Sequence, residues 1–287
     1  MLKSIDDAEL QKQAVECQKM AEVMRAEMIY LTKYGNDTMH WGGSFSSAEI
    51  FAVLYNTVLN CRNTELSFRE KDKFLLSKGH AALGLYTAMH QVGMLSDEQM
   101  KTYQADNSSI SELMEAKPEW GFETSGGSLG INLAYGVGLA LLAKKKGYSY
   151  RVVVEVGDGE IDEGAIWESI MSTSQFKLDN IVLVIDANTV QSDGRTEDIM
   201  SWVHLDDRMK AFGWNILSVD GHDCMQLIDA FVNHFEKEKP LAIIANTVKG
   251  KGVSFMENNY LWHDRVLRGE ELEKAIAEVG CDVKFRY

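Results

Sequence analysis

The sequence predicts an α/β protein: a doubly wound, mostly parallel sheet with helices on both faces and a helical N-terminal layer. From residue 151 onward, short apolar runs alternate with amphipathic segments of about a dozen residues. The first third of the chain instead carries apolar residues at helical spacing. Helices that connect strands in this way return the chain right-handedly, so the strands are expected to be parallel.

The elements are assigned in chain order. Residues 6–34 and 48–59 are predicted helices, and Ser46 or Ser47 can cap the second one. A further helix is expected from Ile131. The predicted strands are 152–156, 181–185, 215–219 and 241–248, and the helices between and beside them are 165–176, 206–212 and 224–236. The chain has two prolines and no low-complexity linker, so we predict one domain over 1–287, with 1–60 the helical layer and 253–287 a C-terminal tail.

Composition and charge exclude several function classes. A chain of 287 residues that is 45% hydrophobic can bury a large core. Its net charge of −14 disfavours nucleic acid and anionic membranes as partners. The cysteines form no Cys-x-x-Cys pair, which favours a reducing cytosol over a zinc site or a disulfide framework; they are Cys17, Cys61, Cys224 and Cys281. The longest apolar stretch, 131–143, is too short to span a bilayer and the N-terminus lacks a signal core, so we expect a cytoplasmic protein.

The most informative motifs lie where two predicted strands end. A Gly-Asp-Gly-Glu segment follows the strand at 152–156, and Asp-Ala-Asn follows the strand at 181–185. Their polar and glycine residues are Gly157, Asp158, Gly159, Glu160, Asp186 and Asn188. Carboxyl ends of parallel strands share one sheet edge, where ligands bind in this architecture. If the two strands are neighbours, about 5 Å apart, oxygens of Asp158 and Asn188 can bind one Mg²⁺ or Ca²⁺ ion that also holds a diphosphate.

Two other interpretations of these motifs remain open. Gly-x-Gly after a strand also begins a dinucleotide fingerprint, but Asp162 replaces its third glycine, and nearby carboxylates would repel a metal-free pyrophosphate. An acidic turn without any ligand is the other alternative. Asn188 at the end of the following strand disfavours it.

At this point the chain resembles the thiamine diphosphate enzymes, whose motif is Gly-Asp-Gly followed by an asparagine. By this resemblance Asp158, Asn188 and the backbone carbonyl of Val190 are the metal ligands. Four further segments look like transketolase segments in the same order, namely 77–82, 125–130, 247–252 and 262–263. The match covers nearly the whole sequence. In particular, the chain looks like the N-terminal subunit of a split transketolase. In such an enzyme this subunit is the diphosphate-type domain, which handles the diphosphate half of the cofactor, and a separate chain handles the aminopyrimidine half.

The resemblance implies roles for three histidines. His40 occupies the place of an active-site histidine that hydrogen-bonds the sugar near its reacting carbon, and His80 and His263 are placed near the diphosphate and the reaction centre. His40 and His80 also lie in glycine-bearing loops before predicted helices, where a neutral imidazole can shuttle protons or bind a hydroxyl group. The expected cofactor-binding set is His80, Gly127, Ser128, Leu129, Gly157, Asp158, Gly159, Glu160, Asp186, Asn188, Val190 and His263.

Some residues keep two interpretations. The glycines at 126, 127 and 130 have two interpretations. They either leave backbone amides available for an anion site before the helix at 131 or allow tight packing of that helix. Glu163 and Glu168 are implied by the resemblance to form a carboxylate network at a subunit interface, with ordinary solvation or compensation of the helix dipole at its N-terminus as the alternative. Lys249 and Lys251 either face the substrate or flank a turn.

The chain departs from ordinary transketolases at three places. Residues 112–114, Glu-Leu-Met, replace a Gly-His-Pro segment whose histidine contacts the donor ketose. Ser192 replaces a branched apolar residue, and 264–266, Asp-Arg-Val, replace the usual Gly-x-Ala-Pro. These changes predict an altered donor or acceptor sugar.

The activity implied by the resemblance is transfer of a two-carbon ketol unit from a ketose to an aldose, with sugar phosphates as substrates. The family's catalytic glutamate and phosphate-binding arginines lie in the C-terminal half. We therefore expect a partner chain of about 300 residues and a heterotetramer of two copies of each subunit. The alternatives are another thiamine diphosphate enzyme, such as the pyruvate-decarboxylating deoxyxylulose phosphate synthase type, and a non-catalytic binding subunit.

Overall fold

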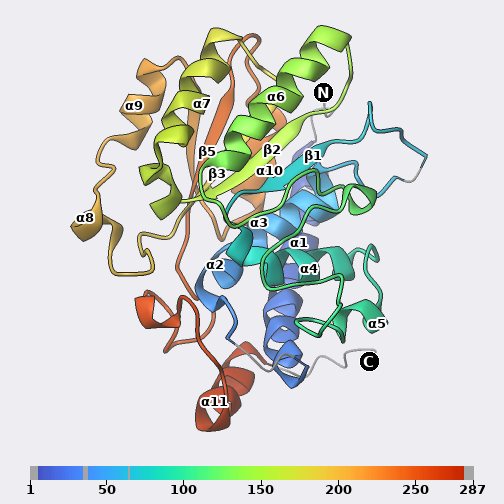
Figure 1. Cartoon of the computed structure of the whole chain (residues 1–287), viewed down its shortest axis with the longest axis vertical. Helices are drawn as coiled ribbons and strands as arrows, with labels where there is room; N and C mark the ends of the chain where they lie inside the picture. The colour runs from blue at the N-terminus through green and yellow to red at the C-terminus, as the bar shows by residue number, and fades with distance from the viewer. Residues whose placement is uncertain (1–5, 35–37, 64, 281–287) are drawn as a thin grey trace.

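A computed structural model describes residues 6–34, 38–63 and 65–280 and shows one five-stranded parallel sheet (Figure 1). The strand order is β1-β2-β3-β5-β4, and every neighbouring pair is parallel. The strands are β1 (Lys73–Leu76), β2 (Val152–Gly157), β3 (Ile181–Ala187), β4 (Asn215–Asp220) and β5 (Leu241–Asn246). The predicted doubly wound α/β class is confirmed, and so is the pairing of β2 with β3.

The helices precede, connect and follow the strands. The α-helices are α1 (Asp7–Tyr30), α2 (Trp41–Ser46), α3 (Ala48–Val53), α4 (Ala82–Gln91), α5 (Asp97–Met100), α6 (Ile131–Lys146), α7 (Gly164–Gln175), α8 (Thr196–Ile199), α9 (Leu205–Ala211), α10 (Cys224–Asn233) and α11 (Gly269–Val279). The 3₁₀ turns are η1 (Leu31–Lys33), η3 (Gly79–Ala81), η4 (Pro118–Trp120), η5 (Gly159–Asp162) and η6 (Tyr260–Trp262), and η2 (Leu54–Val58) is a π-helix. None of the described helices is long and apolar enough to cross a membrane.

Side chains from the two faces of the sheet enter two separate hydrophobic clusters. In β2, Val153 packs with α1, α3, α4 and α10, whereas Val152 and Val154 pack with α6, α7 and α9. Strands that are covered on both faces consist of continuous apolar residues, and all seven residues of β3 are buried. Figure 1 shows α6, α7 and α9 on one side of the sheet and α1, α3, α4 and α10 on the other.

Several local predictions were incomplete or wrong. Strand β1 was not predicted, and the C-terminal region contains α11 rather than only a tail. Ser47 stands before α3 but makes no capping hydrogen bond, because its hydroxyl donates to the buried carboxylate of Glu155. Residues 1–5 of the expected helical layer and 281–287 of the expected tail, with Cys281, lie outside the described residues.

Candidate functional site

Four neighbouring strands deliver polar residues to one cavity at the carboxyl edge of the sheet. Lys78 and His80 follow β1, the Gly-Asp-Gly segment follows β2, Asn188 follows β3 and Lys249 follows β5. The cavity has a volume of about 170 Å³. Of the residues expected at the cofactor, it is lined by His80, Leu129, Gly157, Asp158, Gly159, Glu160, Asp186, Asn188, Val190 and His263. Gly127 and Ser128 precede Leu129 but do not line this cavity.

A larger cavity of about 390 Å³ lies beside it, formed largely by residues 195–206. The two cavities are linked through Thr196, whose hydroxyl donates to Asp158 Oδ2 over 3.1 Å. We regard the smaller cavity as the chemical centre because it contains the buried carboxylates, lysines and histidines.

The expected metal ligands converge at this cavity. Asp158 is 3% exposed and its Oδ1 accepts a hydrogen bond from the N–H of Gly159. Asn188 Oδ1 accepts from the N–H of Val190 over 3.1 Å, and the Lys249 ammonium donates to the Val190 carbonyl over 2.7 Å. Carboxylate, amide and carbonyl oxygens are the ligands that Mg²⁺ and Ca²⁺ prefer.

Electrostatics also fit a cation at this point. Burial, together with the charge of Asp186, raises the pKa of Asp158 to about 6. Burial lowers the pKa of Lys249 to about 8, although Asp158 and Asp186 oppose that shift. A buried carboxylate with a raised pKa is stabilised in its charged form by a nearby cation. The Lys249 ammonium lies against the Val190 carbonyl, so the candidate ligand set already stabilises one positive charge. The residues therefore fit a metal ion.

Asp186 organises the floor of the cavity. Its Oδ2 accepts hydrogen bonds from Lys78 (2.6 Å), Ser46 (2.7 Å) and Asn188 (2.8 Å). Its Oδ1 accepts from the Thr247 hydroxyl. Burial would raise the pKa of Asp186, but the ammonium of Lys78 holds it below its usual value. The Asp186 carboxylate therefore fixes the side chain of Asn188 from beneath.

Glu160 joins the loops that follow β1 and β2. Its Oε1 accepts from the hydroxyl of Ser77 and from the N–H of Gly130 (2.7 Å), and its Oε2 accepts from the N–H of Gly157. The expectation of a free amide at Gly130 is therefore wrong. The amide of Gly126 is also engaged, since it donates to the Met114 carbonyl over 2.7 Å.

The packing interpretation holds for Gly126. A Cβ atom on Gly79 would lie 2.5 Å from the Cα atom of Gly126, and a Cβ on Gly126 would lie 2.4 Å from the Cα of Gly79. Only glycine at both positions permits this approach of two backbones. The contact brings the loop of His80 against the loop that leads to Leu129.

The three predicted histidines form a triangle of rings beside the cavity. Ring centroids lie 5.4 Å apart for His40 and His80, 5.3 Å for His40 and His263, and 5.2 Å for His80 and His263. Burial, followed by the charge of neighbouring groups, lowers the pKa of His80 well below its usual value and that of His263 to about 3. Both imidazoles are therefore neutral at physiological pH.

Hydrogen bonds define which nitrogen of His263 carries the proton. The Lys249 ammonium donates to His263 Nδ1 over 3.0 Å, so the neutral ring holds its proton on Nε2. Lys249 thus faces the cavity. Lys251 is half-exposed and pairs with Glu257, so of the two interpretations it fits the turn.

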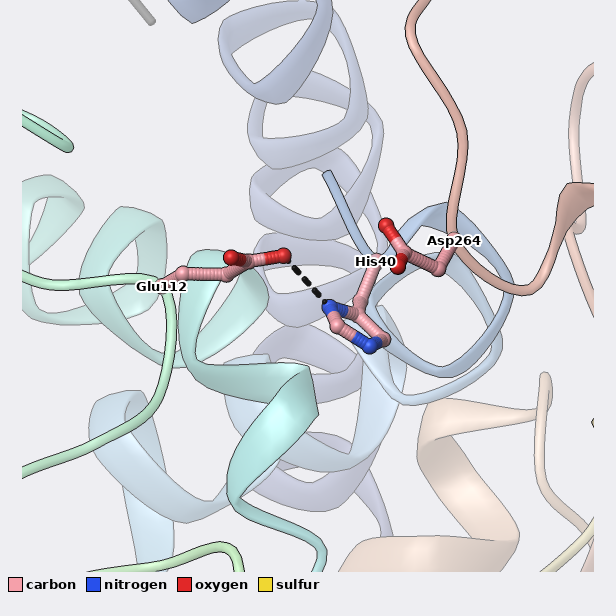
Figure 2. A group of neighbouring side chains, drawn as sticks. All are labelled: His40, Glu112 and Asp264. Carbon is pink, nitrogen blue, oxygen red and sulfur yellow. Dashed lines mark hydrogen bonds and ion pairs between the residues drawn. The ribbon is translucent and has the colours of Figure 1, made fainter. Parts of the chain in front are cut away.

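Sequence reasoning missed three charged residues near the site. Lys78 is fully buried and lies between Asp186 and Glu155. Glu112 and Asp264 meet His40 from two different loops (Figure 2). Both acidic residues fall in segments that depart from the transketolase pattern, and Glu155 interrupts a run of valines. The departures from the transketolase pattern and the charged residue within an apolar strand were the available signals. Neither signal specifies which residues meet in space.

Comparisons with known proteins agree with this fold. The family model described as transketolase, thiamine diphosphate binding domain, matches residues 17–287. A subunit of the apulose-4-phosphate transketolase of Actinobacillus succinogenes is 35% identical over 264 residues, which is 92% of this chain and 96% of that protein. The 6-deoxy-6-sulfo-D-fructose transketolase subunit of a Clostridium species is 32% identical over 94% of this chain and 98% of that protein.

Solved structures give the same result. Transketolase from Leishmania mexicana superposes with a TM-score of 0.81 at 26% identity, covering 92% of this chain and 41% of that protein. For transketolase from Campylobacter jejuni the TM-score is 0.81, with 26% identity over 94% of this chain and 43% of that protein. The chain thus spans less than half the length of these solved enzymes.

The fold and the family model define the class as a thiamine diphosphate-binding α/β domain. The chain belongs to the transketolase family, whose members are transferases.

Proposed function

We propose that this chain is the N-terminal subunit of a two-chain transketolase that transfers a two-carbon ketol unit from a ketose phosphate to an aldose. Its cofactors are thiamine diphosphate and Mg²⁺ or Ca²⁺, and residues 1–287 act as one domain. The observation that carries the proposal is the convergence of Asp158, Asn188 and Val190 beside three imidazoles. The relatives named for apulose-4-phosphate and 6-deoxy-6-sulfo-D-fructose support an unusual sugar substrate.

Each group of residues has a separate task in this proposal. Asp158, Asn188 and the Val190 carbonyl hold the metal, and Asp186 fixes Asn188. When bound, thiamine diphosphate supplies the nucleophilic carbon and the electron sink for breaking a carbon–carbon bond. His263 donates a hydrogen bond through Nε2 to a sugar oxygen, and neutral His80 adds no positive charge to that of the lysines at the cavity.

A partner chain is part of the proposal. The relatives that this chain covers almost completely are each named as one subunit of a transketolase, whereas it covers 38% of human transketolase at 35% identity. A partner of about 300 residues would contribute the remaining part of the active site. Cys17, Cys61 and Cys224 are free, in keeping with a cytoplasmic location.

An apolar surface on α6 and α7 supports a homodimer of this chain within an α2β2 assembly. Ile131, Tyr135 and Met171 are 46–52% exposed. A Cβ on Gly138 would meet no atom within 4 Å, so the helix is open to close approach by another helix. Exposed Glu163 and Glu168 lie on or beside α7, where the resemblance places an interface network.

The metal assignment predicts that Asp158→Ala abolishes metal-dependent binding of thiamine diphosphate. The variant removes a side-chain ligand from a ligand set of three, so we expect affinity to fall at least about a hundredfold. The measurement is isothermal titration calorimetry with Mg²⁺, on the chain alone and on its mixture with the candidate partner. Asp193→Ala, which removes an exposed carboxylate after β3, is the matched control. Unchanged affinity in Asp158→Ala would contradict the assignment.

A further inference from the structure

Three side chains from distant segments meet at the triangle of histidines. His40 precedes α2, Glu112 lies in the loop before η4, and Asp264 follows η6 (Figure 2). One ligand atom from each of the three lies within 4.8 Å of the others. The side chain of His40 is 17% exposed and that of Glu112 is 31% exposed, so solutes can reach this group. The cluster therefore lies beside His80 and His263, which line the cavity, and is partly open to solvent.

The contact with Glu112 determines how His40 faces a substrate. His40 Nδ1 lies 2.8 Å from Glu112 Oε1. An ionised carboxylate only accepts hydrogen bonds, so Nδ1 carries the proton and Nε2 of the neutral ring is an acceptor. Lys249 holds His263 in the opposite tautomer, with the proton on Nε2. The two rings thus offer one acceptor and one donor to the same hydroxyl-bearing molecule.

Asp264 adds a second negative charge that no described cation neutralises. The neighbouring Arg265 bonds Glu271 over 3.2 Å and lies over the ring of Trp262. Lys249 directs its ammonium to two carbonyls and to His263. Among the described residues, the Asp264 carboxylate makes no ion pair. Two carboxylates therefore lie beside His40.

We propose that Glu112 and Asp264 are specificity-determining residues for the donor, an inference that rests on the proposed ketol transfer. They select a donor whose reacting end is uncharged and rich in hydroxyl groups, and they reject 2-oxo acids. Hydroxyl groups donate hydrogen bonds to carboxylates and to His40 Nε2. A 2-oxo acid carries its carboxylate next to the reacting carbonyl, and like charges placed side by side weaken binding strongly.

The proposal is tested with a charged and an uncharged donor, whose ratio of turnover is compared between variants. Erythrulose is uncharged and hydroxypyruvate is a 2-oxo acid, and both deliver the same two-carbon unit. In the assembled two-chain enzyme, the ratio of kcat/KM for hydroxypyruvate to kcat/KM for erythrulose is measured in the wild type and in Glu112→Gln, Asp264→Asn and the double variant. We expect the ratio to rise about threefold in each single variant and about tenfold in the double variant. Glu273→Gln, which removes an exposed carboxylate on α11, should leave the ratio unchanged.

Three outcomes of this assay are decisive. A ratio that rises only in the three active-site variants supports the proposal. An unchanged ratio in the double variant, with erythrulose turned over normally, overturns the proposal but leaves the transketolase function intact. Absence of ketol transfer by the wild-type pair from both donors and from a panel of ketose phosphates would overturn the proposed function and the donor assignment with it.

The orientation of His40 is measured independently of activity. Long-range ¹H–¹⁵N correlation spectra of the ¹⁵N-histidine-labelled chain report which nitrogen is protonated. Nδ1 of His40 should carry the proton in the wild type and in Glu112→Gln, whose amide oxygen still accepts, but not in Glu112→Leu. Unchanged signals of the other histidines establish that the variants are folded. Protonation of Nε2 in the wild type overturns the assignment, as does a saturable shift of His40 on adding Zn²⁺ that Asp264→Asn abolishes, because the cluster would then be a metal site.

Discussion

Glu49 connects three elements through one buried carboxylate. It accepts two hydrogen bonds of 2.6 Å from Arg25 on α1 and lies 2.9 Å from His222 Nδ1, beyond β4. His222 Nε2 in turn accepts from the N–H of Val248 over 2.9 Å. Burial alone would raise the pKa of Glu49, but the charges and hydrogen bonds of Arg25 and His222 lower it to about 2. This relay reaches the segment that holds Lys249.

The shift predicts a loss of stability in acid. The pKa of Glu49 is about 2 in the folded chain and has its usual value of 4.5 in the unfolded chain. The stability that Glu49 contributes is therefore complete above the unfolded pKa and is lost as pH falls through the folded pKa. We expect the difference in unfolding free energy between wild type and Glu49→Gln to shrink by about 2 kcal/mol from about pH 6 to about pH 3. Urea unfolding at both pH values measures it. Glu16→Gln, an exposed change on α1, should show no such dependence, and a pH-independent difference would contradict the account.

The positions of individual site residues were predictable to different degrees. Asp158 and Asn188 could be placed because each directly follows a strand with a clear apolar pattern, and parallel neighbours end at the same edge. The meeting of Glu112 with His40 could not, because the two lie 72 residues apart in irregular segments. No local periodicity specifies such a contact.

Among the elements, α10 shows how a short sequence signal defines a helix boundary. Asp223 accepts hydrogen bonds from the amides of Met225 and Gln226, and the helix then buries Leu227 and Phe231 in the core beside α1. A capping side chain satisfies amides that have no partner within the helix. The predicted start of this helix at residue 224 is confirmed.

The cap predicts a modest stability effect. Asp223→Ala should lower the free energy of unfolding by about 1 kcal/mol, while Asp223→Ser should retain most of it, because a hydroxyl oxygen also accepts from the first-turn amides. Chemical denaturation followed by circular dichroism measures both variants. An alanine variant as stable as the wild type would show that the cap contributes nothing.

The missed elements share a physical reason. Strand β1 has four residues and pairs with β2, 79 positions further along the chain, for example Lys73 with Val152. A run this short has too few residues for a pattern, and its stability comes from tertiary pairing. The π-helix η2 continues the apolar helical pattern of 48–59. That pattern does not distinguish an α-helical turn from a π-helical turn.

At the scale of the whole molecule, α6 and α7 expose large apolar side chains where an ordinary solvated surface would be polar. Tyr135 and Ile131 are on α6 and Met171 is on α7, and the two helices pack against each other. Exposed apolar residues gathered on one face indicate a protein–protein contact. A two-fold arrangement would place the same stripe of each copy against the other.

If the chain forms the proposed homodimer through this face, Tyr135→Glu should convert it from dimer to monomer without unfolding it. A charge at the centre of an apolar interface should weaken association by about a hundredfold or more. Sedimentation velocity gives the mass, and the circular dichroism spectrum gives the fold. Lys145→Gln on the same helix lowers the net charge by the same one unit and is the control. A wild-type monomer, or a variant that remains dimeric, would contradict the assignment of this face.

The segment that carries Glu112 is anchored by its main chain at Met114. The amide of Met114 approaches the Gly79 carbonyl, and its carbonyl accepts from Gly126, while Leu113 is 43% exposed. Exchange of the side chains at 112 and 113 therefore leaves the anchoring bonds intact and costs little folding free energy. During evolution, point mutations in this segment could change the sugar preference of the proposed enzyme while the residues of the candidate cofactor site stay unchanged.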